Sequence, residues 1–191
     1  MDHIYITEFE NELQKILNFW ATKVVDEEHG GFYGQIENDN SIVAQSAKGA
    51  VLHARILWFF SAAYNHSKQP DQLRMAQRCF HYIRDHFIDR EFGGVYWSVD
   101  FEGSPLDTKK QIYALSFAIY GLAEFYKASN DQEALDLAIS LFGDIEKYSF
   151  DPHNKGYFEA FSRDWQAIAD LRLSDKDANE KKTMNTHLHI L

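Results

Sequence analysis

The residue types best suited to binding a polar ligand or moving a proton stand near the end of the chain, in KKTMNTHLHIL (residues 181–191). An imidazole titrates near neutral pH and can act as acid, base or hydrogen-bonding group. Asn185 and His189 are four residues apart, so a helix would place them on one face. His187 and His189 are two apart and would point roughly 200° from each other on a helix. If the tail is helical, Asn185 and His189 are therefore the pair that can share a binding site.

A metal site is the alternative for the same tail. On a strand, His187 and His189 would share a face and form a His-x-His pincer. Met184, Leu188 and Leu191, however, follow helical spacing, and no acidic or further histidine cluster lies nearby in sequence. These observations favour a helix, and no metal is predicted.

Two more polar residues interrupt apolar segments: Arg55 in VLHARILWFF and Tyr113 in KKQIYALSF. A buried arginine needs a partner, because an unpaired buried charge is strongly unfavourable. One interpretation pairs Arg55 with a carboxylate of the core. The other directs its guanidinium to substrate hydroxyls or to developing negative charge, and both fit the sequence equally well. Tyr113 taken alone is better explained by packing, with its hydroxyl hydrogen-bonded.

The elements that would position these residues are organised by a repeat. Three stretches align without gaps: DEEHGGFYGQI from Asp26, DREFGGVYWSV from Asp89 and DPHNKGYFEAF from Asp151. Their common glycines, Gly31, Gly94 and Gly156, are 63 and 62 residues apart. Each stretch has an acidic start, glycines able to adopt positive φ and the alternation of a short strand. Nearly equal steps of this length indicate an array of supersecondary units.

Helical periodicity fills the segments between the glycine stretches. We predict three amphipathic helices, with apolar stripes at Phe9, Leu13, Ile16, Leu17, Trp20 and Val24; at Leu73, Ala76, Phe80, Ile83 and Phe87; and at Ala134, Leu137, Ala138, Leu141 and Ile145. AKGAVLHARILWFFSAAY and QIYALSFAIYGLAEFY are apolar around most of their circumference and should be enclosed on several sides. We therefore predict that each unit consists of an outer helix, a glycine turn with a short strand, and an inner helix. The tail would be the third inner helix.

Outer and inner helices that alternate in two layers predict an α/α architecture whose inner helices surround a central pocket. We expect residues 1–191 to form one all-α domain of three repeats of about 62 residues with short β turns between the helices. Three units would leave the lateral faces of the terminal inner helices open, which is costly for apolar helices. More chain, or a second copy related by a two-fold axis, would complete the ring.

Composition restricts the class of protein. A net charge of −10, from 19 basic and 29 acidic residues, opposes binding to nucleic acids and to acidic membranes. Cys79 is the only cysteine, which excludes an intrachain disulfide, and its surroundings are typical of a helix core. The N-terminus lacks the pattern of a signal peptide, and the longest apolar tract is too short to span a bilayer. We expect a soluble cytoplasmic protein.

Three segments carry a family resemblance: AKGAVLHARILWFFSAAY, FGGVYWSVDFEGSPLDTKKQIYALSFAIYGLAEFY and KKTMNTHLHIL. Together they resemble the N-terminal half of the cellobiose 2-epimerases, in the N-acylglucosamine 2-epimerase superfamily of (α/α)6 barrels. The resemblance covers nearly the whole chain and implies that its three helical hairpins are half of a six-hairpin barrel. It also implies an isomerase that converts the reducing-end glucose of β-1,4-linked disaccharides to mannose through a cis-enediolate, without a metal or redox cofactor.

The resemblance also implies roles for the polar residues. Arg55 matches an arginine at the carbonyl end of the sugar, Tyr113 a pocket tyrosine, Asn185 a substrate-binding asparagine and His189 a supporting histidine. The family's two acid/base histidines and its sugar-stacking tryptophans belong to the C-terminal half, so the 191-residue chain alone is expected to be inactive.

Several alternatives remain open from the sequence. Epimerisation of N-acylglucosamine and aldose–ketose isomerisation share the enediolate, so the substrate is an oligosaccharide or a monosaccharide. Outside catalysis, the chain would be a silent carbohydrate-binding or scaffold fragment, or a non-functional product of truncation.

Overall fold

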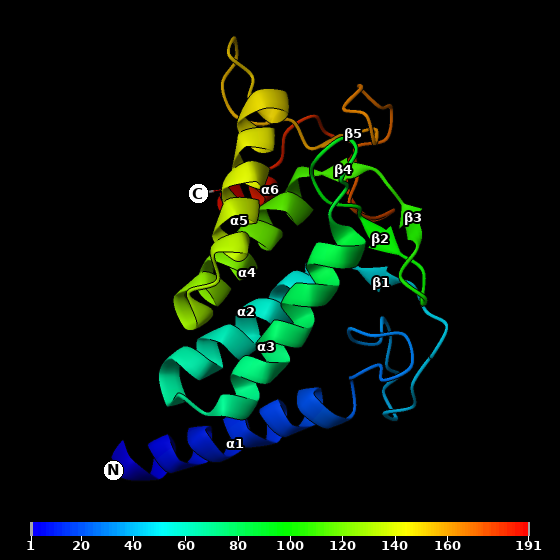
Figure 1. The fold of residues 1–191 in the computed structure, drawn as a ribbon. Helices are drawn as coiled ribbons and strands as arrows, with labels where there is room; N and C mark the ends of the chain where they lie inside the picture. The colour runs from blue at the N-terminus through cyan, green and yellow to red at the C-terminus, as the bar shows by residue number, and fades with distance from the viewer. Residues whose placement is uncertain (1, 191) are drawn as a thin grey trace.

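The computed structural model describes residues 2–190 of the chain, and outer and inner helices alternate along it (Figure 1). The outer helices are α1 (Asp2–Thr22), α3 (Pro70–Tyr82) and α5 (Gln132–Asp144). The inner helices are α2 (Ala50–Ser67), α4 (Ile112–Ser129) and α6 (Met184–Ile190). Helices α3 and α5 each continue into a π-helical turn, Ile83–Phe87 and Ile145–Ser149. The predicted alternation of amphipathic and apolar helices is confirmed.

The inner helices lie side by side and form one layer. Helix α4 packs between α2 and α6, while α3 covers α2 and α5 covers α4 (Figure 1). Gly121 permits the close approach of α2 and α4, because a Cβ atom there would lie 2.6 Å from the carbonyl oxygen of Ala54. The core between the layers is rich in phenylalanine, and its fully buried members include Phe32, Phe60, Phe80, Phe87 and Phe125.

Short strands gather at one end of the helices (Figure 1). Antiparallel strands β1 (Lys48–Gly49), β2 (Ser98–Val99) and β3 (Pro105–Asp107) form one small sheet, and β4 (Lys110–Gln111) pairs with β5 (Ala160–Phe161). The strand that leads into each of the inner helices α2 and α4 thus pairs with the strand that follows the glycine turn of the next unit. This pairing fixes the starts of the inner helices relative to one another.

An ion pair that the sequence analysis did not predict holds each glycine turn. The pairs are Asp26 with Lys48 (2.7 Å), Asp89 with Lys110 (2.8 Å) and Asp151 with Lys182 (2.6 Å). The Oδ1 atom of each aspartate also accepts backbone N–H groups two and three residues further on. Each lysine lies two residues before an inner helix, so the ion pair joins that helix to the turn before it.

Helix α1 departs from the predicted burial. Leu17 and Val24 are in the core as predicted, but Phe9 and Ile16 are 74% and 41% exposed, so their predicted burial is wrong. The N-terminal part of α1 projects beyond α2 and α3, and a helix that extends past its neighbours leaves its apolar stripe uncovered (Figure 1).

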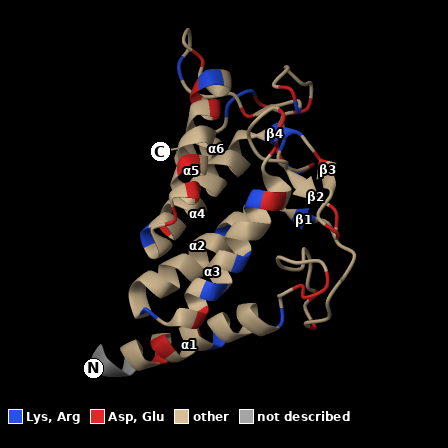
Figure 2. Ribbon diagram, in the orientation of Figure 1, with Lys and Arg blue, Asp and Glu red and all other residues tan. Residues whose placement is uncertain are grey.

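Charged residues are sparse in the inner helices. Lysine, arginine, aspartate and glutamate are spread over the outer helices and turns, whereas α2 contains Arg55 and α4 contains Glu124 and Lys127 (Figure 2). Cys79 is fully buried, as its sequence context predicted. Within residues 2–190, no helix is both long enough and apolar enough to cross a membrane.

Candidate functional site

The tail segment is helical, so its two histidines point in different directions, as the spacing predicted. His187 turns back to the glycine turn: its Nε2 atom accepts the N–H of Tyr157 (2.9 Å), and its Nδ1 atom lies 2.7 Å from the carbonyl oxygen of Thr183. Both ring nitrogens of His187 are therefore occupied by the backbone.

The predicted apolar spacing of the tail has a mixed outcome. Met184 and Leu188 are 76% and 61% exposed, so they do not bury an apolar face of α6 against the described part of the chain. Leu191, the third member of that pattern, lies outside the described residues.

Arg55, Tyr113 and His189 come together from three successive inner helices. Nη2 of Arg55 donates a hydrogen bond to the Tyr113 hydroxyl (3.3 Å), and the guanidinium lies over the ring of Phe117 at 4.5 Å. The His189 ring is 4.4 Å from that of Phe117 and meets the Tyr113 ring edge-on at 4.9 Å between centroids. We call Arg55, Tyr113, Phe117 and His189 the inner-face cluster.

Arg55 itself is exposed, so the expectation of a buried arginine is wrong. Within residues 2–190, no carboxylate forms an ion pair with it, and the interpretation that pairs it with a core carboxylate is wrong as well. Its contacts are a neutral hydroxyl and an aromatic face, which attract a guanidinium without neutralising it. Because a guanidinium has five N–H donors, most of those of Arg55 remain available to a ligand.

A cavity of about 420 Å³ opens beside the cluster and is lined by Ser116, Phe117, Tyr120, Leu188 and His189. The Tyr120 ring stacks on that of Trp58 at 5.2 Å, with 12° between the planes. Aromatic walls with a few polar groups are typical of small-molecule sites. Sequence reasoning missed Phe117, Tyr120 and Trp58, although Phe117 and Tyr120 follow Tyr113 at four and seven residues, the spacing of one helix face.

Asn185 lies elsewhere. It is exposed and lines a smaller cavity together with the segment between β5 and α6, which contributes Arg172, Asp177 and Thr183. The structure thus brings together Arg55, Tyr113 and His189 of the four predicted site residues, and it places Asn185 one helical turn away, at a neighbouring cavity.

The electrostatics of the cluster favour a neutral imidazole. Partial burial lowers the pKa of His189, and the nearby Arg55 charge lowers it further. At neutral pH the ring is therefore mainly uncharged and can both donate and accept a hydrogen bond.

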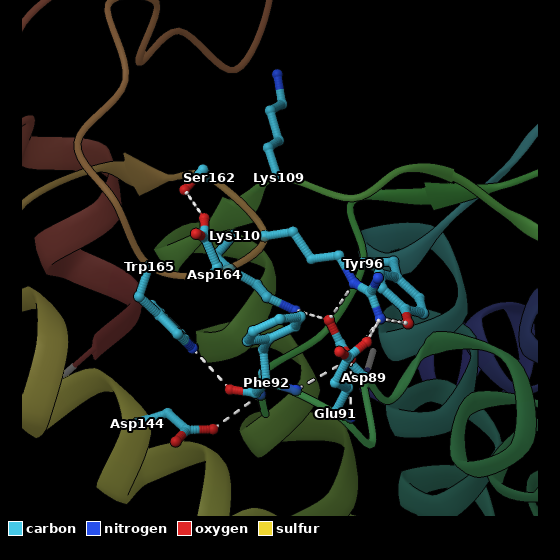
Figure 3. A network of polar contacts seen from close by, with 12 residues as sticks. Asp89, Glu91, Phe92, Tyr96, Lys109, Lys110, Asp144, Ser162, Asp164 and Trp165 are labelled. Carbon is cyan, nitrogen blue, oxygen red and sulfur yellow. Dashed lines mark hydrogen bonds and ion pairs between the residues drawn. The ribbon is translucent and has the colours of Figure 1, made fainter.

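The segment that leads to α6 is fastened to the second glycine turn (Figure 3). Arg163 donates to Asp89 (2.9 Å), and Nε1 of Trp165 donates to the carbonyl oxygen of Phe92 (2.8 Å). Burial alone would raise the pKa of Asp89, but hydrogen bonds from Arg163 and Lys110 hold it well below its ordinary value. The approach to the third inner helix is therefore anchored at a buried carboxylate.

A two-layer arc of alternating outer and inner helices is the architecture of part of an α/α barrel. Comparison with known proteins specifies the family. The sequence profile of the N-acylglucosamine 2-epimerase (GlcNAc 2-epimerase) family matches residues 31–179, and the chain belongs to this family.

Individual relatives carry a more specific name. The chain is 56% identical over 192 residues to the cellobiose 2-epimerase of Bacteroides fragilis, a match that covers 100% of the chain and 49% of the relative. The crystal structure of a sugar epimerase from a ruminal bacterium matches with a TM-score of 0.91 and 44% identity over 97% of this chain and 47% of the other. Cellobiose 2-epimerase from Bacillus thermoamylovorans B4167 matches with a TM-score of 0.93 and 38% identity over 98% and 48%.

These matches confirm the predicted fold class, a mostly helical relative of the (α/α)6 barrels, and the predicted resemblance to cellobiose 2-epimerases, which are isomerases. The chain spans about half the length of the curated relatives it matches.

Proposed function

We propose that this chain supplies the substrate-binding half of a carbohydrate 2-epimerase that converts the reducing-end glucose of cellobiose-type β-1,4-disaccharides to mannose. The observation that carries the proposal is the convergence of Arg55, Tyr113 and His189 from α2, α4 and α6 beside one cavity. The names of the relatives support the reaction and the disaccharide.

The cluster provides what an enediolate reaction requires at one end of the sugar. In the proposed mechanism the pyranose ring opens, the proton on C2 is removed, and negative charge moves onto the carbonyl oxygen. Arg55 would stabilise that oxygen with its unused N–H donors, because such groups are strongest where charge develops. Tyr113 would orient the guanidinium through its hydroxyl, and the neutral His189 imidazole would hydrogen-bond to the reacting end.

The remaining steps need groups outside the cluster. After rotation about the C2–C3 bond, a proton must return to the opposite face of C2, so two acid/base groups must face each other across the enediolate. The cluster holds one imidazole, that of His189. We assign proton transfer to two histidines of the half of the protein beyond these 191 residues, and hydrogen bonding to a sugar hydroxyl to Asn185. In this proposal, residues 1–191 are three of the six hairpins of one barrel domain, and a C-terminal half that carries the two histidines completes it.

A chimaera tests the proposal. The chain, which aligns along its whole length with 49% of the Bacteroides fragilis relative, is fused to the part of that relative that the alignment leaves uncovered. We expect the chimaera to convert cellobiose to glucosyl-mannose and the 191-residue chain alone to show no conversion above background. Formation of a ketose would replace the proposed epimerisation with aldose–ketose isomerisation. Conversion of N-acylglucosamine in preference to cellobiose would replace the proposed substrate. A folded chimaera without activity on any of these sugars would contradict the proposal.

A further inference from the structure

Glu159, the residue before β5, has a buried carboxylate that the proposed reaction does not use. Its side chain is 1% exposed. Oε1 accepts the backbone N–H of Thr183 (2.6 Å), and Oε2 accepts the hydroxyl of Thr186 (2.5 Å). Thr183 directly precedes α6 and Thr186 lies in its first turn. Both carboxylate oxygens are therefore committed to the start of the helix that carries His189.

The backbone of the same residue contacts two further segments. The carbonyl oxygen of Glu159 accepts the N–H of Ile112 (2.9 Å), the first residue of α4, and its N–H donates to the carbonyl oxygen of Lys181 (3.0 Å). Glu159 thus joins the start of α4, which carries Tyr113, to the start of α6. No other described residue makes hydrogen bonds of this kind to both helix starts.

The repeat shows that the fold itself does not need a carboxylate at this position. Gly34 and Trp97 stand at the equivalent places in the first and second units, three residues after Gly31 and Gly94. The aspartate–lysine ion pairs recur in all three units and account for the turns. The third unit is the one whose inner helix carries His189, and it alone has the glutamate.

We propose that Glu159 is a positioning residue that sets the rotation of α6 on α4, so that the His189 imidazole rests against Phe117 and Tyr113. Thr186 is three residues before His189, on a neighbouring part of the same short helix, so a hydrogen bond that fixes Thr186 also fixes the direction of His189. The geometric part of this inference is independent of the reaction; only its consequence for turnover depends on the proposed function.

Nuclear magnetic resonance on the 191-residue chain tests the geometric part. The ring protons of His189 should show ring-current shifts from Phe117 and Tyr113, and its pKa should be lowered. In Glu159→Gln we expect the ring-current shifts to be lost and the pKa of His189 to return toward its ordinary value. Glu146→Gln is the matched control: it is the same change in the same unit, at a carboxylate that binds the Tyr157 hydroxyl (2.6 Å) and not α6, and it should leave His189 unchanged.

If Glu159→Gln does not fold, a second pair of variants, at Thr186, tests whether the contact with Glu159 positions His189. Thr186→Val keeps the shape but removes the hydroxyl, and it should shift the His189 resonances in the same direction. Thr186→Ser keeps the hydroxyl and should restore them. Unchanged His189 shifts and pKa in the folded Glu159→Gln or Thr186→Val chain would overturn the inference.

Kinetic measurements on the chimaera distinguish a failure of this inference from a failure of the proposed function. In the active chimaera, misplacing His189 should reduce kcat on the order of 10- to 100-fold, because small errors in the position of a substrate-contacting group are costly. Glu146→Gln should leave kcat unchanged. If the chimaera is inactive but the His189 resonances still depend on Glu159, the proposed function fails while the positioning role stands.

Discussion

Nζ of Lys110 lies 2.8 Å from Oδ2 of Asp89, and neither side chain is exposed to solvent. The corresponding pair in the first unit, Lys48 and Asp26, is almost as deeply buried. In the third unit Lys182 is 25% exposed. Ion pairs, buried in two of the three units, therefore tie the start of each inner helix to its glycine turn, and the inner-face cluster lies on helices held in this way.

Removing Lys110 should be strongly destabilising. Lys110→Met leaves the Asp89 carboxylate buried with Arg163 as its remaining ionic partner, and breaking a buried pair from one side costs about 3 kcal/mol or more. Urea denaturation measures this loss. Lys182→Met, the equivalent change in the third pair, whose lysine is 25% exposed, should cost less than Lys110→Met. Equal losses in the two variants would show that burial does not set the strength of these pairs.

His53 should make stability depend on pH in the weakly acidic range. The ring is fully buried, its Nε2 accepts the N–H of Phe32 (3.4 Å), and its Nδ1 lies 3.0 Å from the carbonyl oxygen of Gly49. Burial lowers the pKa of His53 from 6.5 to about 4. Between these values the unfolded chain binds more protons than the folded one, so the free energy of unfolding should fall as the pH drops, by about 1.4 kcal/mol per unit.

Urea denaturation at several pH values between 4.5 and 7 checks this slope, and His53→Gln should flatten it. The aspartates of the ion pairs affect stability in a separate pH range. Their pKa values are lowered, so the stability that they contribute is present above about pH 4 and is lost only below it. A wild-type profile that is flat between pH 4.5 and 7 would exclude a buried neutral His53.

Trp165 should control the order of residues 162–183. Its ring stacks on Tyr148 at 4.3 Å with 7° between the planes, and its Nε1 bonds the Phe92 carbonyl oxygen. Trp165→Ala removes both contacts, and we expect proteases to cleave this segment faster and its amides to exchange faster. Phe142→Ala, at an aromatic residue that is 51% exposed, is the control and should change neither rate. If proteases cleave the Trp165→Ala chain at the wild-type rate, the ion pair of Arg163 with Asp89 is sufficient to hold the segment in place.

The parts of the fold that were predictable from the sequence are those set by local rules. Glycine turns at Gly31, Gly94 and Gly156 and the periodicity of the helices depend on residues close in sequence, and the structure has both. The lysine partners of the turns are 21 to 31 residues from their aspartates, so nothing local identifies them. Aligning the repeats beyond the glycine stretches would have found Lys48 and Lys110, which are 62 residues apart.

The errors at the site have physical causes of the same kind. Periodicity reports the average surroundings of a helix, so it assigned Arg55 to the interior, although Arg55 is exposed on the inner face of α2. Spacing of four residues put Asn185 and His189 on one face of α6, but which cavity each meets depends on how α6 sits on α4. That arrangement is set by contacts such as those of Glu159, which no helical pattern contains.

The kcat/KM of the chimaera on cellobiose, measured with Arg55 and with Arg55→Met, tests the central claim most directly. Methionine keeps much of the length and the contact with Phe117 but removes every N–H donor. If the inner-face cluster binds the reacting end of the sugar, we expect kcat/KM to fall on the order of 100-fold or more, with most of the loss in kcat, as when a donor to a developing oxyanion is removed. A loss of less than about threefold, or about 0.65 kcal/mol, in a folded chimaera would contradict the assignment of the inner-face cluster to the reacting sugar.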